Sequence, residues 1–272
     1  MRILHLSDYA GEMLRHSEEQ HLKATHDEAA SRRRHWMAET ELDAARARKP
    51  FWLRLLGLST GEEREAQRCV EEEQQRIERT GSERQELGIQ VQRQQAGAEG
   101  EKVLVDELAT LSDEWVMLCG YRNRGGETDH VIVGPLGVWA VEVKAHNVRL
   151  NVVGDKWSWE RLDRAGNVLE TQPATDSGGR TWARQVNDVA DQLAALLERN
   201  DRRVLVRTAV MLTGERAQLG TCENPEVDLV STRSDDLVKA MTDAASPLDH
   251  AASQAIVELI KRDHRYHNAP QT

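Results

Sequence analysis

Two long polar runs without proline dominate the first third of the chain, and a single proline, Pro50, separates them. Between about Gly11 and Arg48 the sequence is rich in residues that tolerate a helix well. Pro50 ends this run, because proline disfavours the α conformation of the residue before it. The segment from Ser59 to Glu63 then offers a hydroxyl cap followed by acidic residues, which favours the start of a second helix reaching about Gln95. The pattern predicts two antiparallel helices.

The apolar spacing within these two helices is poor. Val70, Ile77 and Val91 follow a seven-residue repeat, but Arg84 stands in the same phase. A sustained coiled coil needs about three to four clean heptads. We therefore predict, for residues 1–96, an arm built as a helical hairpin or a weak coiled coil. An arm of this kind serves homodimerisation or docking on a protein partner, and the alternative is a solvated stalk without a specific role.

An apolar segment, Phe51–Leu58, lies at the turn between the two predicted helices. Contact with a membrane surface is one use for such a segment. Packing between the two helices is the use we expect for Trp52, Leu55 and Leu56. We expect no membrane partner, because no stretch of the chain approaches the roughly 18 apolar residues of a membrane span.

Composition indicates where in the cell the protein is located and how it can bind nucleic acid. The three cysteines are far apart, which argues against a disulfide framework, and the first residues lack the apolar core of a signal peptide. We expect a soluble cytoplasmic protein. The formal net charge of −10 means that nucleic acid must bind at a local basic face or through bound cations.

From Gly97 the sequence changes to alternating helix and strand patterns. The predicted order of helix, antiparallel strands, amphipathic helix and apolar strand indicates an α/β fold with three layers and a mixed sheet. We place this domain at residues 97–245 and a C-terminal helix with a polar tail at 246–272. The predicted strands are 115–121, 128–133, 137–144, 148–153, 156–160, 204–212 and 227–231, and the predicted helices are 102–111, 180–198, one from about 234, and 248–262.

The predicted hairpin of strands 128–133 and 137–144 brings two carboxyl groups together. If Gly134 and Gly137 flank the turn, the numbers of opposed residues sum to 271, so Asp129 faces Glu142. Opposed side chains on paired strands lie about 5 Å apart, and like charges at that separation are destabilising. Protonation of one carboxyl, a nearby cation or a metal ion between the two would each remove the repulsion. A divalent cation such as Mg²⁺ suits carboxylate oxygens.

Lys144 shares a strand face with Glu142, because alternate residues of a strand point the same way. Its ammonium group is placed to hold a water molecule or to stabilise charge on a phosphoryl group. The plainer interpretation is a solvated strand face, with Glu127 and Lys144 as a cross-strand ion pair.

These residues resemble a known family. The motif Gly97-x-x-Gly100-Glu101, then a strand with an acidic residue, then Gly-Val-Trp-Ala-Val-Glu-Val-Lys at 137–144, is similar to the nuclease-related domain (NERD) family of the PD-(D/E)xK phosphodiesterases. The resemblance covers about Gly97 to Met241. It implies a restriction-endonuclease-like core and metal-dependent cleavage of phosphodiester bonds.

The resemblance also implies roles for five residues. Asp129 and Glu142 would be the ligands of Mg²⁺ or Mn²⁺, Lys144 the catalytic lysine, Glu101 a further acid, and Gln185 a contact to the site or substrate. Glu99 competes with Glu101 for the helix acid. Thr128 stands where the superfamily name has proline.

Several other residues are candidates for binding. Basic residues that cluster in sequence around the hairpin could meet the phosphates of nucleic acid. They are Arg122, Arg124, His146, Arg149 and Lys156. Trp157 and Trp159 point the same way, and we expect them to pack in the core rather than stack on bases.

Two histidines and a cysteine have a structural interpretation. His264 and His267 are spaced to share a metal, but we expect them to be exposed in the polar tail. Cys119 lies in an apolar strand and is expected to be a core thiol.

We therefore expect a Mg²⁺- or Mn²⁺-dependent nuclease acting on DNA, with RNA as the other substrate, in DNA processing or defence. The alternative is a NERD-type module with weak or no catalysis that binds nucleic acid or acts as a scaffold through its arm.

Overall fold

The computed structural model describes residues 1–243 and 247–269. The chain divides into two compact units, which are described separately. One is a helical unit, Gly11–Gln95. The other is an α/β unit, Met1–Ala10 together with Ala96–Thr272.

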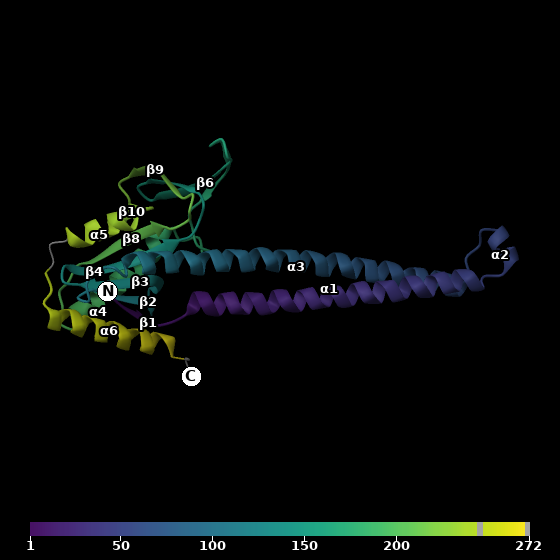
Figure 1. The fold of residues 1–272 in the computed structure, drawn as a ribbon, viewed down its shortest axis with the longest axis horizontal. Helices are drawn as coiled ribbons and strands as arrows, with labels where there is room; N and C mark the ends of the chain where they lie inside the picture. Colours follow the sequence, from purple (N-terminus) through teal and green to yellow (C-terminus); the bar gives the residue numbers. More distant parts are fainter. Residues whose placement is uncertain (244–246, 270–272) are drawn as a thin grey trace. The chain divides into compact units, whose positions relative to one another are not determined.

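The helical unit is a hairpin of two long helices. Helix α1 (Tyr9–Arg48) and helix α3 (Gly61–Leu108) lie side by side, with the short α2 (Phe51–Leu55) in the turn between them (Figure 1). The Thr60 hydroxyl accepts a hydrogen bond from the Glu63 N–H at 3.1 Å, which confirms the predicted hydroxyl cap. The predicted break between residues 95 and 102 is absent, and α3 continues without interruption to Leu108, so its last residues belong to the α/β unit.

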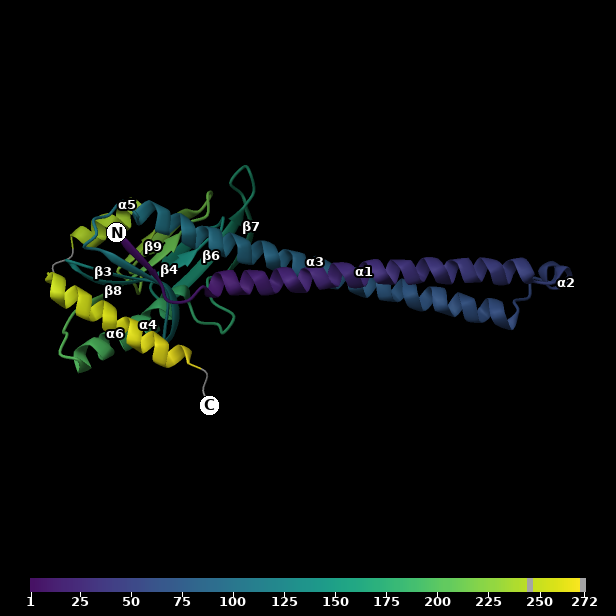
Figure 2. The ribbon, with the colours of Figure 1, turned by 60° about the horizontal axis from the view of Figure 1, so that its bottom comes forward.

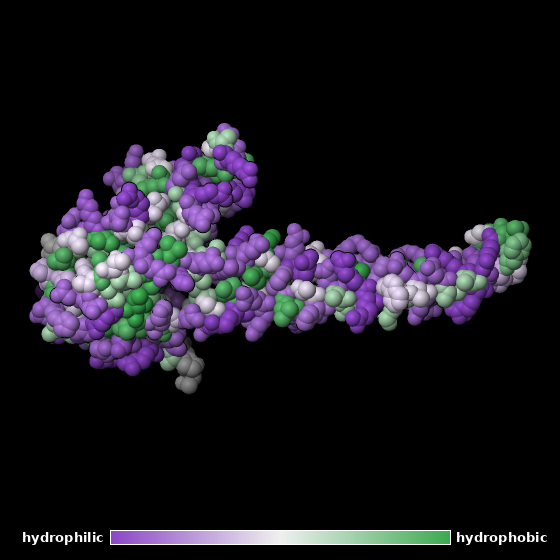
Figure 3. All heavy atoms as spheres, in the orientation of Figure 1, coloured by the Kyte–Doolittle hydropathy of each residue, from purple (hydrophilic) through white to green (hydrophobic). Residues whose placement is uncertain are grey.

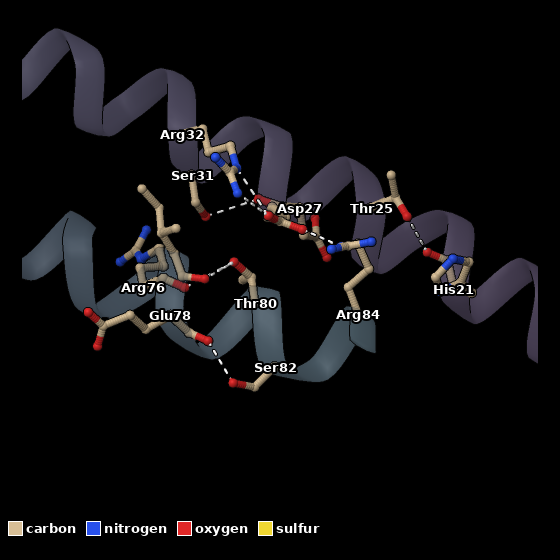
Figure 4. A network of polar contacts seen from close by, with 12 residues as sticks. His21, Thr25, Asp27, Ser31, Arg32, Arg76, Glu78, Thr80, Ser82 and Arg84 are labelled. Atoms are coloured by element: carbon tan, nitrogen blue, oxygen red, sulfur yellow. Dashed lines mark hydrogen bonds and ion pairs between the residues drawn. The ribbon is translucent and has the colours of Figure 1, made fainter. Parts of the chain in front are cut away.

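Small residues, rather than the expected large apolar ones, form the seam between the two helices. On α1 they recur every seven residues and are buried: Ser17, Ala24, Ser31, Ala38 and Ala45. Small side chains let two helix backbones approach closely, so the helices can pack without a conventional leucine seam. Glu28 lies in the same interface, where Arg32 of α1 and Arg84 of α3 both donate to its carboxylate. Figure 4 shows these two arginines among the polar side chains of the two helices.

The turn of the hairpin contradicts one expectation. Trp52 is 61% exposed, Leu55 76% and Leu56 63%, so they do not pack between the helices. The reason is geometric, because α2 lies beyond the ends of α1 and α3, away from the seam between them (Figure 1). Hydrophobic residues gather over α2 in the space-filling view (Figure 3).

The α/β unit is built on a six-stranded mixed sheet with the order β1-β2-β3-β4-β8-β10. Its strands are β1 (Arg2–His5), β2 (Val116–Asn123), β3 (Gly126–Gly134), β4 (Gly137–Lys144), β8 (Val206–Leu212) and β10 (Leu229–Ser231). The first strand was not predicted: Arg2–His5 pairs in parallel with β2, so the first residues of the chain belong to this unit and not to the arm.

Helices cover both faces of this sheet, which gives the predicted three layers (Figure 2). On one face α4 (Trp182–Arg199) and α6 (His250–Asn268) bury Val186, Leu193 and Ile260. On the other face the end of α3 and α5 (Ser234–Thr242) bury Leu104 and Leu237. The apolar spacing of the helix around residues 182–196 is confirmed as the face that contacts the sheet.

A second sheet of four strands has the order β7-β6-β5-β9. The predicted pair β5 (Arg149–Val153) and β6 (Lys156–Leu162) forms its centre, whereas β7 (Val168–Pro173) and β9 (Gln218–Glu223) were not predicted. Trp157 is buried and Trp159 packs against the same core, as expected. Cys119 is also buried.

Two further findings concern the helices. His264 is buried and accepts a hydrogen bond from the Arg122 N–H at 3.2 Å, so the expectation that it is exposed in a polar tail is wrong. The cause is that α6 extends to Asn268 and packs on the sheet. Among the described residues, no helix combines the length and the apolar character needed to cross a membrane.

Candidate active site

The predicted hairpin register is confirmed where β3 and β4 are paired. His130 opposes Val141 and Gly134 opposes Gly137, which is the expected sum of 271. Backbone pairing between the two strands ends at His130 and Val141. Beyond this pair the Thr128 hydroxyl donates to the Val141 carbonyl oxygen at 3.0 Å, and the Asp129 carboxylate accepts the Val143 N–H at 2.6 Å. The side chain of Asp129 therefore replaces a backbone acceptor where the two strands part.

Glu142 and Lys144 lie at the end of β4, where it runs parallel to β8. The Lys144 Nζ donates to Glu142 Oε1 at 2.6 Å and to Gln185 Oε1 of α4 at 3.4 Å. Glu142 is 1% exposed. Its other oxygen, Oε2, is buried without a hydrogen bond of ordinary geometry among the described residues, because the nearby Thr128 hydroxyl, which lowers the pKa of Glu142 slightly, donates to the Val141 carbonyl oxygen instead. A buried carboxylate oxygen in this state costs free energy unless a proton or a cation reaches it.

Gly100 explains how Glu101 reaches the site from a different layer. A Cβ atom at Gly100 would lie 2.4 Å from the Ala145 Cβ and 2.6 Å from the Thr213 Oγ1. Only glycine therefore permits α3 to pass so close to the ends of β4 and β8. The next residue, Glu101, is then near enough to Asp129 and Glu142 for their charges to act on it.

The carboxyl groups of Glu101, Asp129 and Glu142 thus share one partly buried region, and the pKa of each is raised there. Burial, with the charges of Asp129 and Glu142, raises the pKa of Glu101 to about 8. Burial and the charge of Asp129 raise the pKa of Glu142 to about 8. Burial also raises the pKa of Asp129, despite Lys144 and the Val143 N–H. With all three carboxyl groups ionised, the region would hold more negative charge than Lys144 neutralises, which is why protons are held more tightly there.

Lys144 remains a cation in this environment. Burial opposes its charge, but Glu142 and Asp129 outweigh burial and raise its pKa. The ammonium group can therefore donate hydrogen bonds and stabilise negative charge, and it cannot serve as a base near neutral pH.

Trp182, a buried aromatic residue of α4, also lines the site. The Lys144 Nζ lies 5.8 Å from the centre of the Trp182 ring, and the His146 ring stacks on Trp182 with centroids 5.6 Å apart. Trp182 is the first residue of α4, one turn before Gln185. Its apolar helix spacing concealed this second role, and no sequence signal distinguished it from the other core residues of α4.

The predicted basic residues are distributed over two sheets. His146 lies beside Trp182 as described. Arg122 is paired with Glu127 at 2.6 Å, and Arg149 is paired with Glu160 at 2.7 Å in the second sheet. Arg124 and Lys156 are exposed at the ends of different strands, in the first and second sheet respectively. Proximity in sequence did not place these residues together, because they belong to two sheets.

The carboxyl groups suit a hard divalent cation. Within residues 1–243 and 247–269, no three His, Cys, Asp or Glu side chains converge in an arrangement that could hold a metal. Mg²⁺ usually needs only one or two protein carboxylates, and water and substrate phosphates supply its remaining ligands. Glu142 Oε2, buried and without a hydrogen bond of ordinary geometry, provides such an oxygen next to Asp129. The residues present therefore fit Mg²⁺ or Mn²⁺.

Comparison with known proteins bears on one segment of the α/β unit. No curated protein and no solved structure matches the chain. The model of the nuclease-related domain family matches residues 96–213, a segment that contains Glu101, Asp129, Glu142, Lys144 and Gln185. Residues 96–213 of the α/β unit are therefore similar to the nuclease-related domain family.

Proposed function

We propose that the α/β unit is a metal-dependent nuclease that hydrolyses phosphodiester bonds of DNA. The observation that carries this proposal is the grouping of Glu101, Asp129 and Glu142 near one lysine, Lys144. Three carboxyl groups with raised pKa values face one lysine, and the second oxygen of Glu142 makes no hydrogen bond of ordinary geometry among the described residues. Such an arrangement is unfavourable in a structural core and is relieved by a divalent cation.

Each residue has a role in this proposal. Asp129 and Glu142 would hold the ion, and the hydrogen bond from the Val143 N–H holds the Asp129 carboxylate in place. Glu101 would orient the attacking water from the α3 side. A bound Mg²⁺ or Mn²⁺ would polarise a phosphoryl oxygen and lower the pKa of a bound water.

Lys144 and Gln185 act on the substrate side. Because Lys144 stays protonated, its Nζ stabilises the negative charge that develops on the phosphoryl oxygens. Gln185 accepts from Lys144 with its Oε1 and keeps its two amide N–H donors for a phosphate oxygen. Trp182 and His146 form one wall, which limits access of water to Lys144.

The test is cleavage of supercoiled, linear and single-stranded DNA, and of RNA, with Mg²⁺, with Mn²⁺ and with a chelator. Asp129→Asn and Lys144→Met are expected to abolish cleavage. Removing one such group typically costs about a hundredfold or more in rate. Matched controls are Asp235→Asn and Lys239→Met on α5, which change the same residue types outside the site.

Metal binding is measured in parallel. Mg²⁺ is expected to raise the melting temperature of the wild type and of Lys144→Met, but not of Asp129→Asn, because a ligand that binds the folded state stabilises it. Cleavage that survives both site substitutions would contradict the proposal. Metal binding without cleavage of any substrate would instead leave a binding module.

A further inference from the structure

The turn of the helical hairpin exposes an unusual concentration of large apolar side chains. We call residues 49–60 the tip; they connect α1 to α3. Phe51 is 78% exposed and Leu58 53%, in addition to the three side chains described above. They form the hydrophobic cluster over α2 in Figure 3. A contiguous apolar patch of this kind marks a surface that contacts a protein or a membrane.

Charge around the tip differs from that of the chain as a whole. Residues 44–61 include three arginines and one lysine and no acidic residue, although the chain carries a net charge of −10. Lys49 is paired with Glu63, and Arg54 donates to the carbonyl oxygens of Arg46 and Ala47. Arg46 and Arg48 are exposed on the side of the tip nearest α1. An anionic surface would therefore attract the chain at the tip and repel most of the remainder.

Five backbone N–H groups of the tip are already paired internally. The Leu53 and Arg54 N–H groups donate to the Pro50 carbonyl oxygen, and the N–H groups of Leu56, Gly57 and Leu58 donate to carbonyl oxygens within the tip. Gly57 has a φ of +65°, which lets the chain reverse over so few residues. Backbone groups paired in this way do not resist transfer out of water, unlike those of an open loop.

We propose that the tip docks on an anionic lipid bilayer, with Phe51, Trp52 and Leu55 in the interfacial region and the arginines at the phosphate groups. Trp and Leu side chains flanked by cations are the combination that favours this region. A second copy of the chain suits the tip less well. Contact between two tips would bring two sets of cations together, and the nearest acidic residues, Asp43 and Glu63, already pair with Arg46 and Lys49 of the same chain.

The experiment is co-sedimentation of the full chain with vesicles of phosphatidylcholine alone and of phosphatidylcholine mixed with phosphatidylglycerol, at low and high salt. Binding to the anionic vesicles is expected, with weaker binding at high salt and to neutral vesicles. The double variant Phe51→Ser/Trp52→Ser is expected to bind at least about tenfold more weakly, because two large apolar contacts are lost. The double variant Arg46→Gln/Arg48→Gln should lose the difference between the two vesicle types.

Trp36→Ser is the matched control, since Trp36 is 65% exposed on α1 outside the tip. It is expected to leave vesicle binding unchanged. Circular dichroism checks that each variant keeps the helical hairpin. Absence of binding to anionic vesicles would overturn the proposal, and so would equal weakening by Trp36→Ser. A concentration-dependent dimer that the Phe51→Ser/Trp52→Ser variant abolishes, without vesicle binding, would assign the tip to self-association instead.

Discussion

Replacing Gly100 with alanine tests whether the close approach of α3 builds the site. The added Cβ would lie 2.4 Å from the Ala145 Cβ and 2.6 Å from the Thr213 Oγ1. Carbon atoms in ordinary contact lie about 3.5–4.0 Å apart. The helix must therefore move by roughly 1 Å, because the Ala145 Cα also lies within 3.3 Å and cannot yield like a flexible side chain.

Two opposing terms decide the change in stability. Overpacking of this kind costs about 1–3 kcal/mol. Alanine in place of glycine inside a helix contributes up to about 1 kcal/mol in the other direction. The expected net effect is destabilisation by about 1–2 kcal/mol. Gly97→Ala is the matched control, since a Cβ at Gly97 meets nothing within 4 Å, and it should stabilise the protein by about 0.5–1 kcal/mol.

The same displacement moves Glu101 relative to Asp129 and Glu142. A misplacement of about 1 Å can cost about a hundredfold in rate. Chemical denaturation gives the free energy of unfolding of the three proteins, and the cleavage assay gives their rates. The reasoning is refuted if both glycine variants are stabilised alike. It is also refuted if Gly100→Ala cleaves as fast as Gly97→Ala, because α3 would then not hold Glu101 in position.

Two further predictions follow from single contacts. Trp182→Phe keeps an apolar ring in the core but weakens the platform beneath Lys144 and His146, so DNA cleavage should fall severalfold while the melting temperature changes little; equal cleavage would show that the platform is dispensable. His264 has a lowered pKa, chiefly because it is buried, although Glu127 and Asp263 partly oppose the shift. The His264 imidazole therefore binds a proton more readily in the unfolded chain than in the folded one. Its contribution to the free energy of unfolding should be complete above pH about 6.5 and be lost as the pH falls below that value. His264→Phe should flatten this fall in denaturation measured against pH, and an unchanged pH dependence would contradict the assignment.

Much of the site could be predicted from the sequence, because its information is local. The turn between Gly134 and Gly137 sets the register of β3 and β4 as far as His130 and Val141, and a period of two residues places Glu142 and Lys144 on one face of β4. The long polar helices were also predictable, because the breaks at Pro50 and the cap at Thr60 act on neighbouring residues.

Only the tertiary structure decided which distant segments meet. It paired β1 with β2 and buried His264, a residue of α6, against the sheet. It also placed Arg122 and Arg149 in two different sheets. It also showed that α3 passes close enough at Gly100 to bring Glu101 to the carboxyl groups, and that Trp182 is both a core residue and a wall of the site. Hydrogen bonds and turns act over a few residues and leave a local pattern. Packing between layers depends on the shapes of distant segments and leaves no local pattern in the sequence. The hairpin was therefore predictable, and the residues that surround it were not.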